Sequence, residues 1–182
     1  APSTEWRAST FHPPTVEIGR QLGIVAEMLH LGLVGPRYQI RDRQRGCVAE
    51  FDFGVLADDT PYPFRLQLEQ YKYVQILERA LAALPTPVEI GYGRPVAGIT
   101  EDDGVSVALE DGSAVRGDYV IAADGAHSTV RRALGVGFDG TTYRHRYLVL
   151  SILGDLEDLI PGICEINYVA DPYEHLLLLR VP

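Results

Sequence analysis

Tyr119-Val120-Ile121-Ala122-Ala123-Asp124-Gly125-Ala126-His127-Ser128-Thr129-Val130-Arg131-Arg132-Ala133-Leu134-Gly135 is the stretch that says most about the fold. Its first five residues are continuously apolar, which is typical of a strand buried on both faces. Asp124-Gly125 ends this run, and the residues from His127 to Leu134 predict a helix. In a strand–turn–helix unit, ligands bind at the carboxyl end of the strand. We therefore expect a ligand site around Asp124.

The residue types in this turn suit a ligand that carries phosphates and sugar hydroxyls. Glycine at position 125 lets the backbone turn tightly, and the Asp124 carboxylate can accept hydrogen bonds from ribityl or ribose hydroxyls. The helix N-terminus favours a nearby phosphate, and Arg131 adds a fixed positive charge. An Asp-Gly pair alone is also typical of a plain strand-ending turn, so the hypothesis depends on the longer stretch.

The first half of the chain mixes helical and strand-like patterns. Pro13 and Pro14 suit the first turn of a helix, and Gly23 interrupts the apolar pattern that follows them. A second, amphipathic run ends at Pro85. The sequence predicts helices over 14–31, broken near Gly23, and 69–84, and strands over 38–41 and 48–55, with a turn at 43–46 and a loop at 58–63.

Beyond the second helix the apolar period changes to two. Short β-rich runs separated by Asp-Gly and Gly-Asp turns predict a β-meander that feeds the strand at 119–123. The last third has strand candidates without helices between them, which favours the start of an antiparallel sheet. The expected strands are 88–90, 96–100, 105–109 and 114–116, then 147–153, 164–169 and 176–181.

Bulk properties exclude several classes of protein. A net charge of -9 argues against nucleic acid as a partner, because phosphate backbones are bound by clustered lysine and arginine. Cys47 and Cys164 lack disulfide or zinc spacing, which fits a reducing cytoplasm. No apolar run approaches the ~20 residues of a membrane span. The acidic groups at 58–59 and 101–103 fall in turns without further ligands, so we expect no metal site.

The 119–135 stretch closely resembles the Asp-Gly motif of class A flavoprotein monooxygenases, the para-hydroxybenzoate hydroxylase-like family. In that family the motif serves both FAD and the pyridine nucleotide. Residues 7–17 resemble the segment after the second Rossmann strand, where an arginine, here Arg7, reaches the flavin. Residues 68–70 resemble a segment whose glutamine approaches the flavin chain; Gln70 matches it, and Gln67 is the alternative register.

The resemblance extends over essentially the whole chain. Gly93-Arg94-Pro95-Val96 is similar to a family strand whose backbone lies along the adenine. The resemblance thus implies that Val96 contacts the cofactor, and that His127 and Arg131 assist the nicotinamide cofactor. The implied site residues all bind cofactors and include no catalytic side chain and no metal ligand: Arg7, Gln70, Val96, Asp124, Gly125, His127 and Arg131.

The same resemblance implies the fold and the reaction. The fold class is α+β (α/β), with a partial FAD-binding Rossmann-type domain over residues 1–140, to which the β-meander belongs. Residues 141–182 begin a substrate domain with an antiparallel sheet. A contribution of residues 37–70 to this substrate domain stays open. The implied enzyme uses FAD and NAD(P)H to hydroxylate a phenolic or related aromatic substrate through a flavin hydroperoxide.

Several alternatives stay open from the sequence. No Gly-x-Gly-x-x-Gly precedes Arg7, and the later Gly-Asp flavin motif of the family is not found, so we expect a central fragment that does not hold FAD tightly alone. A flavin halogenase or reductase of the same fold is one alternative. Another is a non-catalytic binding or scaffold module in which Asp124 and Arg131 are structural.

Four of the implied cofactor-binding residues have an alternative role that the sequence leaves open. Arg7 could be a solvated surface charge, Gln70 a helix cap, Val96 part of the core and His127 an exposed polar residue. Expected partners are a small aromatic substrate, no nucleic acid and no membrane span, and a homodimer remains open.

Overall fold

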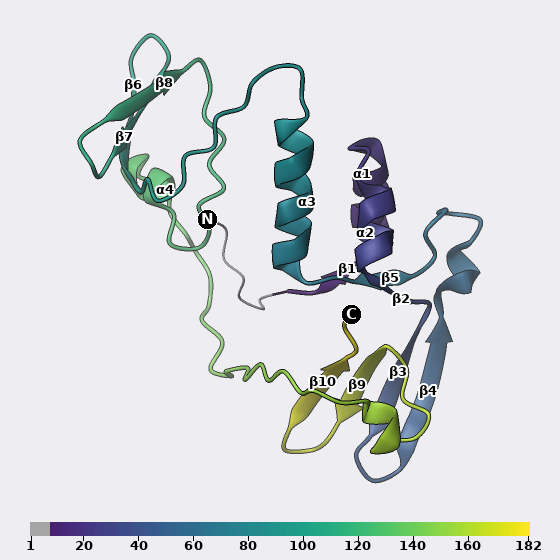
Figure 1. Ribbon diagram of the computed structural model, residues 1–182. Helices are drawn as coiled ribbons and strands as arrows, with labels where there is room; N and C mark the ends of the chain where they lie inside the picture. The colour runs from purple at the N-terminus through teal and green to yellow at the C-terminus, as the bar shows by residue number, and fades with distance from the viewer. Residues whose placement is uncertain (1–7) are drawn as a thin grey trace. The chain divides into compact units, whose positions relative to one another are not determined.

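The computed structural model of the chain describes residues 8–182, and these divide into two compact units (Figure 1). The helical unit contains the residues up to Val88 together with Ile152–Pro182. The meander unit contains Glu89–Ser151. Helices and largely antiparallel sheets are mixed, which confirms the expected fold class. No described helix combines the length and apolar character that crossing a membrane requires.

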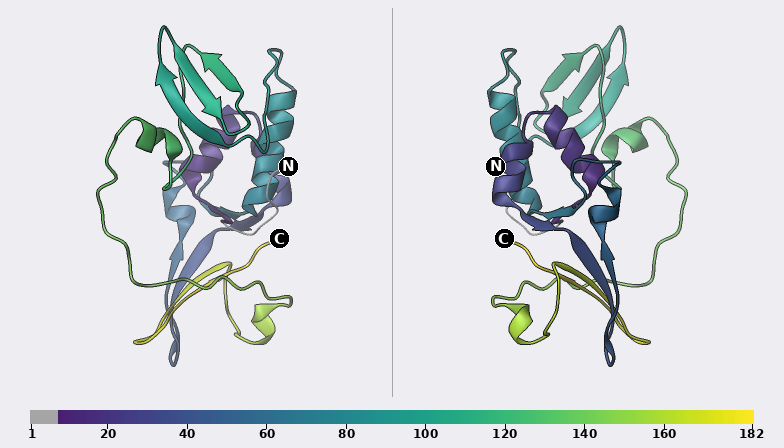
Figure 2. Two further views of the ribbon diagram at one scale, coloured as in Figure 1. Left: turned by 90° about the vertical axis from the view of Figure 1, so that its left-hand side faces the viewer. Right: turned by 90° about the vertical axis from the view of Figure 1, so that its right-hand side faces the viewer.

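A small sheet beneath three helices forms the core of the helical unit (Figure 2). The strands are β1 (Thr10–Phe11), β5 (Arg65–Gln67) and β2 (Leu33–Gly35), in the antiparallel order β1-β5-β2. The helices are α1 (Pro13–Gln21), α2 (Val25–Leu31) and α3 (Gln70–Ala82). The buried core joins side chains of all three helices to strand β5 and consists of Val16, Ile24, Met28, Leu66, Leu68 and Ile76.

The expected break in the first helical pattern is confirmed at Gly23. Its backbone has φ +73°, a left-handed conformation that glycine adopts without steric cost. Gly19 lets α1 and α2 approach each other closely, because a Cβ atom at this position would lie 2.6 Å from Met28 Sδ. The break therefore lets two short helices, in place of one long helix, cover the same sheet.

The second sheet of the helical unit has four strands in the order β10-β9-β3-β4. The bounds are β3 (Arg37–Asp42), β4 (Gly46–Asp52), β9 (Ile166–Ala170) and β10 (His175–Leu179). Strands β3 and β9 are parallel, with Gln39 opposite Asn167, whereas the two outer pairs are antiparallel. The expected sheet is thus present but mixed, and it combines strands from the early and late parts of the chain.

Strand β4 begins two residues and ends three residues earlier than expected. The expected strand at 48–55 ends at Asp52, whose side chain accepts a hydrogen bond from the Gly54 backbone N–H and starts the 3-10 turn η1 (Phe53–Leu56). A second 3-10 turn, η2 (Leu156–Asp158), lies in the long connection before β9. Asx turns of this kind compete with the sheet ladder for backbone groups.

The meander unit contains the predicted hairpins. Strands β6 (Val96–Glu101), β7 (Val105–Leu109) and β8 (Ala114–Gly117) pair in sequence order and antiparallel, which confirms the β-meander. Gly104 and Gly112 occupy the two turns with positive φ. The short helix α4 (Thr129–Ala133) contacts β6 and replaces the longer helix expected near 127–134.

Three expected strands are not formed. Residues 88–90, 119–123 and 147–153 have no regular structure. Tyr119 and Ile121 are 90% and 95% exposed, so the buried strand expected before Asp124 is wrong for this structure. The physical reason is that a strand needs partners for its backbone N–H and C=O groups, and none of the strands within residues 8–182 pairs with these segments.

Candidate functional site

The Asp124 carboxylate is held by the helix that follows it. One oxygen accepts a hydrogen bond from the Ser128 hydroxyl, and the other accepts the backbone N–H groups of Thr129 at 2.8 Å and Val130 at 3.2 Å. The Ser128 hydroxyl is the largest cause of a lowered pKa at Asp124, because it stabilises the ionised carboxylate. The side chain is therefore a fixed, exposed anion at the start of α4.

Gly125 makes the turn between Asp124 and α4 possible. Its φ is +77°, and a Cβ atom at this position would have no neighbour within 4 Å. The Gly125 carbonyl accepts the Ser128 backbone N–H at 3.0 Å. Glycine is thus required by the backbone conformation, and the space beside it is open.

The start of α4 is not free for a phosphate, contrary to the expectation from the sequence. Asp124 binds the N–H groups of Thr129 and Val130, and the Ser128 hydroxyl accepts the Arg131 N–H at 2.9 Å. These are the backbone donors that a helix start would otherwise offer to an anion. The carboxylate also adds a negative charge at this point.

The Arg131 side chain folds back onto its own turn. One guanidinium nitrogen, Nη1, donates to the Ala126 carbonyl at 2.8 Å, and the guanidinium carbon lies 4.4 Å from the centroid of the Phe138 ring. His127 directly follows Ala126 in the sequence, and it is exposed. The structure thus brings Asp124, Gly125, His127 and Arg131 together in one turn, with the arginine stabilising the turn from within.

Val96 belongs to the same unit as this turn. It is the first residue of β6, pairs with Leu109 of β7 and is half-buried. Its neighbour Arg94 donates to the Ser113 hydroxyl at 2.8 Å. The preceding loop is thereby tied to the β7–β8 turn, so the backbone at the start of β6 is held in place.

Gln70 is the first residue of α3 in the helical unit, and it is exposed. Its backbone N–H donates to the Ala8 carbonyl at 2.9 Å, which extends the pairing of β1 with β5. Its side chain does not cap α3, because the N-cap position is Glu69 and no side chain bonds the helix start. The capping alternative is therefore wrong, and the Gln70 side chain is exposed without a hydrogen bond to another of residues 8–182.

Gln67, the alternative register, is fully buried. Its Oε1 accepts a hydrogen bond from the Thr10 hydroxyl at 3.0 Å, and its Nε2 has no partner within the described part of the chain. Glu69 is also buried, with Oε1 2.7 Å from Lys72 Nζ and with Oε2 unpartnered among residues 8–182. Arg7 lies outside the described residues.

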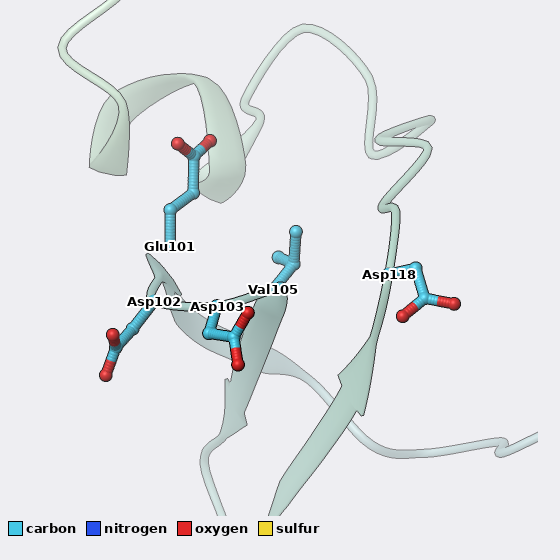
Figure 3. Close-up of a pocket in the computed structure, with 6 residues that line it drawn as sticks. Glu101, Asp102, Asp103, Val105 and Asp118 are labelled. Atoms are coloured by element: carbon cyan, nitrogen blue, oxygen red, sulfur yellow. The ribbon is translucent and has the colours of Figure 1, made fainter.

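An open, acidic hollow lies at the β6–β7 turn of the meander unit (Figure 3). Carboxylates from the end of β6, from the turn and from residue 118 line it, which opposes binding of a phosphate or another anion. Within the described residues no cluster of His, Cys, Asp and Glu could hold a metal. The lining side chains labelled in the figure are Glu101, Asp102, Asp103, Val105 and Asp118.

Sequence reasoning missed two features of the site. Ser128 was not singled out, although a serine directly before a helical run is a recognisable N-cap signal. The strand β5 was also missed, although Arg65-Leu66-Gln67-Leu68 alternates polar and apolar residues with a period of two. Both signals lie in short segments, one beside the apolar run 119–123 and the other beside the amphipathic run 69–84.

The site is thus a carboxylate fixed at the Gly125 turn before helix α4, in the same unit as an antiparallel meander. The chain belongs to the family described as the FAD binding domain, whose model matches residues 1–170. Among curated relatives, the para-nitrophenol 4-monooxygenase of Pseudomonas sp. (strain WBC-3) is 29% identical over 180 residues, covering 96% of this chain and 44% of the relative.

Two further comparisons agree with this family. The rifampicin monooxygenase of Streptomyces venezuelae is 32% identical over 162 residues, covering 86% of this chain and 30% of the relative. The crystal structure of p-nitrophenol 4-monooxygenase from Pseudomonas putida DLL-E4 matches with a TM-score of 0.83 at 29% identity, covering 97% of this chain and 45% of that chain. The chain thus spans less than half the length of these relatives.

Proposed function

We propose that the protein containing this chain is an FAD- and NAD(P)H-dependent monooxygenase that hydroxylates a phenolic or related aromatic substrate. The observation that carries the proposal is the fixed Asp124 carboxylate at the Gly125 turn, in a chain that belongs to the FAD-binding family. The names of the similar proteins, among them a para-nitrophenol 4-monooxygenase, support an aromatic substrate.

The residues present fit FAD at two places. At the first, Asp124 offers ionised acceptor oxygens to ribityl or ribose hydroxyls, and Gly125 leaves open space beside them. At the second, Gln70 is exposed at the start of α3, next to the buried Oε2 atom of Glu69, which has no partner in the described part of the chain. Buried polar atoms without partners are rare, which supports a bound group in their vicinity.

The roles of the remaining residues follow from the same proposal. FAD, when bound, supplies the redox chemistry with NAD(P)H and oxygen. The chain orients the cofactor: Arg7 and Gln70 toward the flavin, and Val96 through its backbone along the adenine. His127, exposed in the turn, and Arg131 would assist the nicotinamide cofactor. Arg131 must then either leave the Ala126 carbonyl or act through the face of its guanidinium.

We propose the domain organisation on the same basis. Residues 1–140 form part of the FAD-binding domain, and 141–182 begin the substrate domain. The pairing of β3 and β4 with β9 and β10 in one sheet supports a contribution of 37–70 to the substrate domain. Free thiols at Cys47 and Cys164 support a reducing compartment such as the cytoplasm. A homodimer is part of the same proposal.

The experiment uses the full-length protein. We expect the purified protein to carry flavin absorption bands, and NAD(P)H oxidation to accelerate when a phenol is added, with a hydroxylated product detected by mass spectrometry. Asp124→Ala should lower the FAD content, whereas Asp139→Ala, an exposed carboxylate in the same unit, serves as the control. The 182-residue chain alone should not hold FAD tightly. A full-length protein without bound or bindable FAD would contradict the proposal.

A second candidate function is a non-catalytic module in which Asp124 and Arg131 are structural. One observation favours it. Asp124 accepts a hydrogen bond from the Thr129 backbone N–H, and Arg131 donates one to the Ala126 carbonyl, so both side chains bind the backbone of the turn. In that case Asp124→Ala would lower thermal stability, and the unsubstituted full-length protein would bind no FAD. Binding of FAD with phenol-dependent oxidation of NAD(P)H excludes this candidate.

A further inference from the structure

Strand β5 separates two different environments in the helical unit. Leu66 within the strand and Leu68 just beyond it are fully buried in the core formed with the helices. Arg65, Gln67 and Glu69 alternate with these leucines, so they point to the opposite face, because successive side chains of an extended chain alternate. Three polar residues at every second position therefore share one face of β5.

Each of these three residues carries a buried polar atom without a hydrogen-bond partner among residues 8–182. The atoms are Arg65 Nε, Gln67 Nε2 and Glu69 Oε2. An unsatisfied buried polar atom costs about 1–3 kcal/mol, and such atoms are rare in folded proteins. Three of them in a row on one strand face indicate a surface whose partner is a bound molecule.

Arg65 is held in a fixed orientation by aromatic rings. Its Nη1 donates to the Tyr168 hydroxyl at 2.8 Å, and its guanidinium carbon lies 5.1 Å from the Tyr38 ring centroid and 5.2 Å from that of Phe53. Cation–π contacts of this kind stabilise a guanidinium without neutralising its charge. The edge formed by Nε and Nη2 has no hydrogen-bond partner among the described residues.

The charge of Arg65 also lacks a counter-ion in the described part of the chain. Arg37 and Arg79 pair with carboxylates within 4.0 Å, whereas Arg65 forms no such pair there. The positive charge of Arg65 also acts on His12. Burial lowers the pKa of the His12 imidazole, and Arg65 lowers it further. The surroundings of Arg65 therefore favour a group that brings negative charge or electron-rich oxygens.

We propose that Arg65, assisted by Gln67, recognises a planar two-oxygen substituent on the aromatic substrate, namely a carboxylate or a nitro group. The Nε and Nη2 donors of arginine form a fork whose geometry matches two such oxygens. Gln67 Nε2 adds a donor two residues along the same face. The inference rests on the proposed function, because it names a substituent of the proposed aromatic substrate and the residues that bind this substituent.

The test measures ligand affinity of the full-length protein by isothermal titration calorimetry, which does not require turnover. The probes are 4-nitrophenol, 4-hydroxybenzoate and 4-methylphenol, which share a phenol and differ in the opposite substituent. Arg65→Met should weaken binding of the preferred nitro or carboxylate probe by roughly 10- to 100-fold and leave 4-methylphenol nearly unchanged. The wild-type preference between the first two probes identifies the substituent.

Two further variants distinguish the effect of the planar pair of Arg65 donors from the effect of its positive charge. Arg65→Lys keeps the positive charge and loses the planar fork, so it should restore little of the affinity lost in Arg65→Met. Arg79→Met, which removes an exposed arginine on α3, is the matched control and should leave the affinity for all probes unchanged. Full affinity in Arg65→Lys, or equal losses for all three probes in Arg65→Met, would overturn the proposal.

A stability measurement keeps the role of Gln67 testable. Gln67→Leu removes the unpartnered Nε2 donor and also the hydrogen bond that Oε1 accepts from the Thr10 hydroxyl, two effects of opposite sign. The ligand-free melting temperature should therefore change little while probe affinity falls. In Gln39→Leu the melting temperature should fall, because the Gln39 amide donates to Glu50 at 2.7 Å and to the Gly162 carbonyl at 3.0 Å. A destabilised Gln67→Leu variant with unchanged affinity would make Gln67 structural. Absent FAD or phenol-stimulated oxidation in the wild type would contradict the proposed function instead.

Discussion

The hydroxyl of Ser128 joins Asp124 to the start of helix α4. It donates to Asp124 Oδ1 and accepts the Arg131 backbone N–H at 2.9 Å. Ser128 is buried, whereas the carboxylate it holds is exposed. One small side chain thus fixes both the helix start and the orientation of the anion on which the proposed cofactor site depends.

Ser128→Ala should therefore have two separate effects. Loss of the N-cap should lower the free energy of unfolding by about 1 kcal/mol, measured by urea denaturation. Loss of the hydroxyl, the largest cause of the lowered Asp124 pKa, should raise this pKa, measured by carboxyl NMR titration. Ser128→Gly is the matched control, because glycine caps helices nearly as well but lacks the hydroxyl. An unchanged Asp124 pKa in both variants would contradict this role.

The lowered Asp124 pKa also predicts a pH dependence of stability. Because the folded pKa lies below the unfolded one, its contribution is fully present above the unfolded pKa and is lost as pH falls through the folded pKa. Asp124→Asn should therefore be less stable than wild type near neutral pH, with the difference shrinking as pH falls below about 4. Melting temperatures of both proteins across this range test it, and a constant difference would contradict it.

Gly125→Ala tests the turn without touching a side-chain contact. The left-handed φ of +77° is unfavourable for alanine by about 1–2 kcal/mol, although a Cβ atom there would meet nothing within 4 Å. We expect a loss of this size in the free energy of unfolding. Gly137→Ala in the same unit, where φ is not positive, is the control and should change stability little. Equal stability of both variants would mean that the turn relaxes.

The sequence predicted those elements whose stability is local. The amphipathic pattern ending at Pro85 predicted α3, and the Asp-Gly turns predicted the β-meander, because helical spacing and turn chemistry are properties of neighbouring residues. Strand β5, with only Arg65–Gln67, escaped notice because its stability comes from β1 and β2, which lie far away in the sequence. The polar–apolar alternation of Arg65-Leu66-Gln67-Leu68 is present, but it is short compared with the amphipathic pattern that follows it.

Where the prediction failed, partners outside the segment decided the outcome. The run Tyr119–Ala123 has the composition of a buried strand, yet no strand within the described residues pairs with it and its side chains are exposed. Apolar composition shows that a segment can be buried, but backbone hydrogen bonding needs a neighbour. Ser128 carries a local N-cap signal, but its hydrogen bond to Asp124 depends on where α4 begins, at Thr129.

Ile76→Ala tests the core beneath the helices. Ile76 lies on α3, is 1% exposed and packs in one cluster with Leu66 and Leu68 of the β5 segment. Truncation should lower the free energy of unfolding by about 2–5 kcal/mol through lost burial and the cavity left behind. Val55→Ala, at a position 82% exposed, is the control and should stay within about 0.5 kcal/mol of wild type. A loss in Ile76→Ala as small as in the control would contradict the packing.

The two cysteines should differ in reactivity toward a thiol reagent such as 5,5′-dithiobis(2-nitrobenzoate). Cys47 is exposed on β4, whereas Cys164 is buried, its Sγ lies 3.1 Å from the Ile166 carbonyl, and burial raises the pKa of its thiol. Because the thiolate is the reactive form, Cys164 should react only as fast as the protein opens. Variants with a single cysteine, Cys47→Ser and Cys164→Ser, separate the two rates. Denaturant should accelerate labelling of Cys164 far more than that of Cys47. Equal rates in the native protein would mean that Cys164 is not buried in solution.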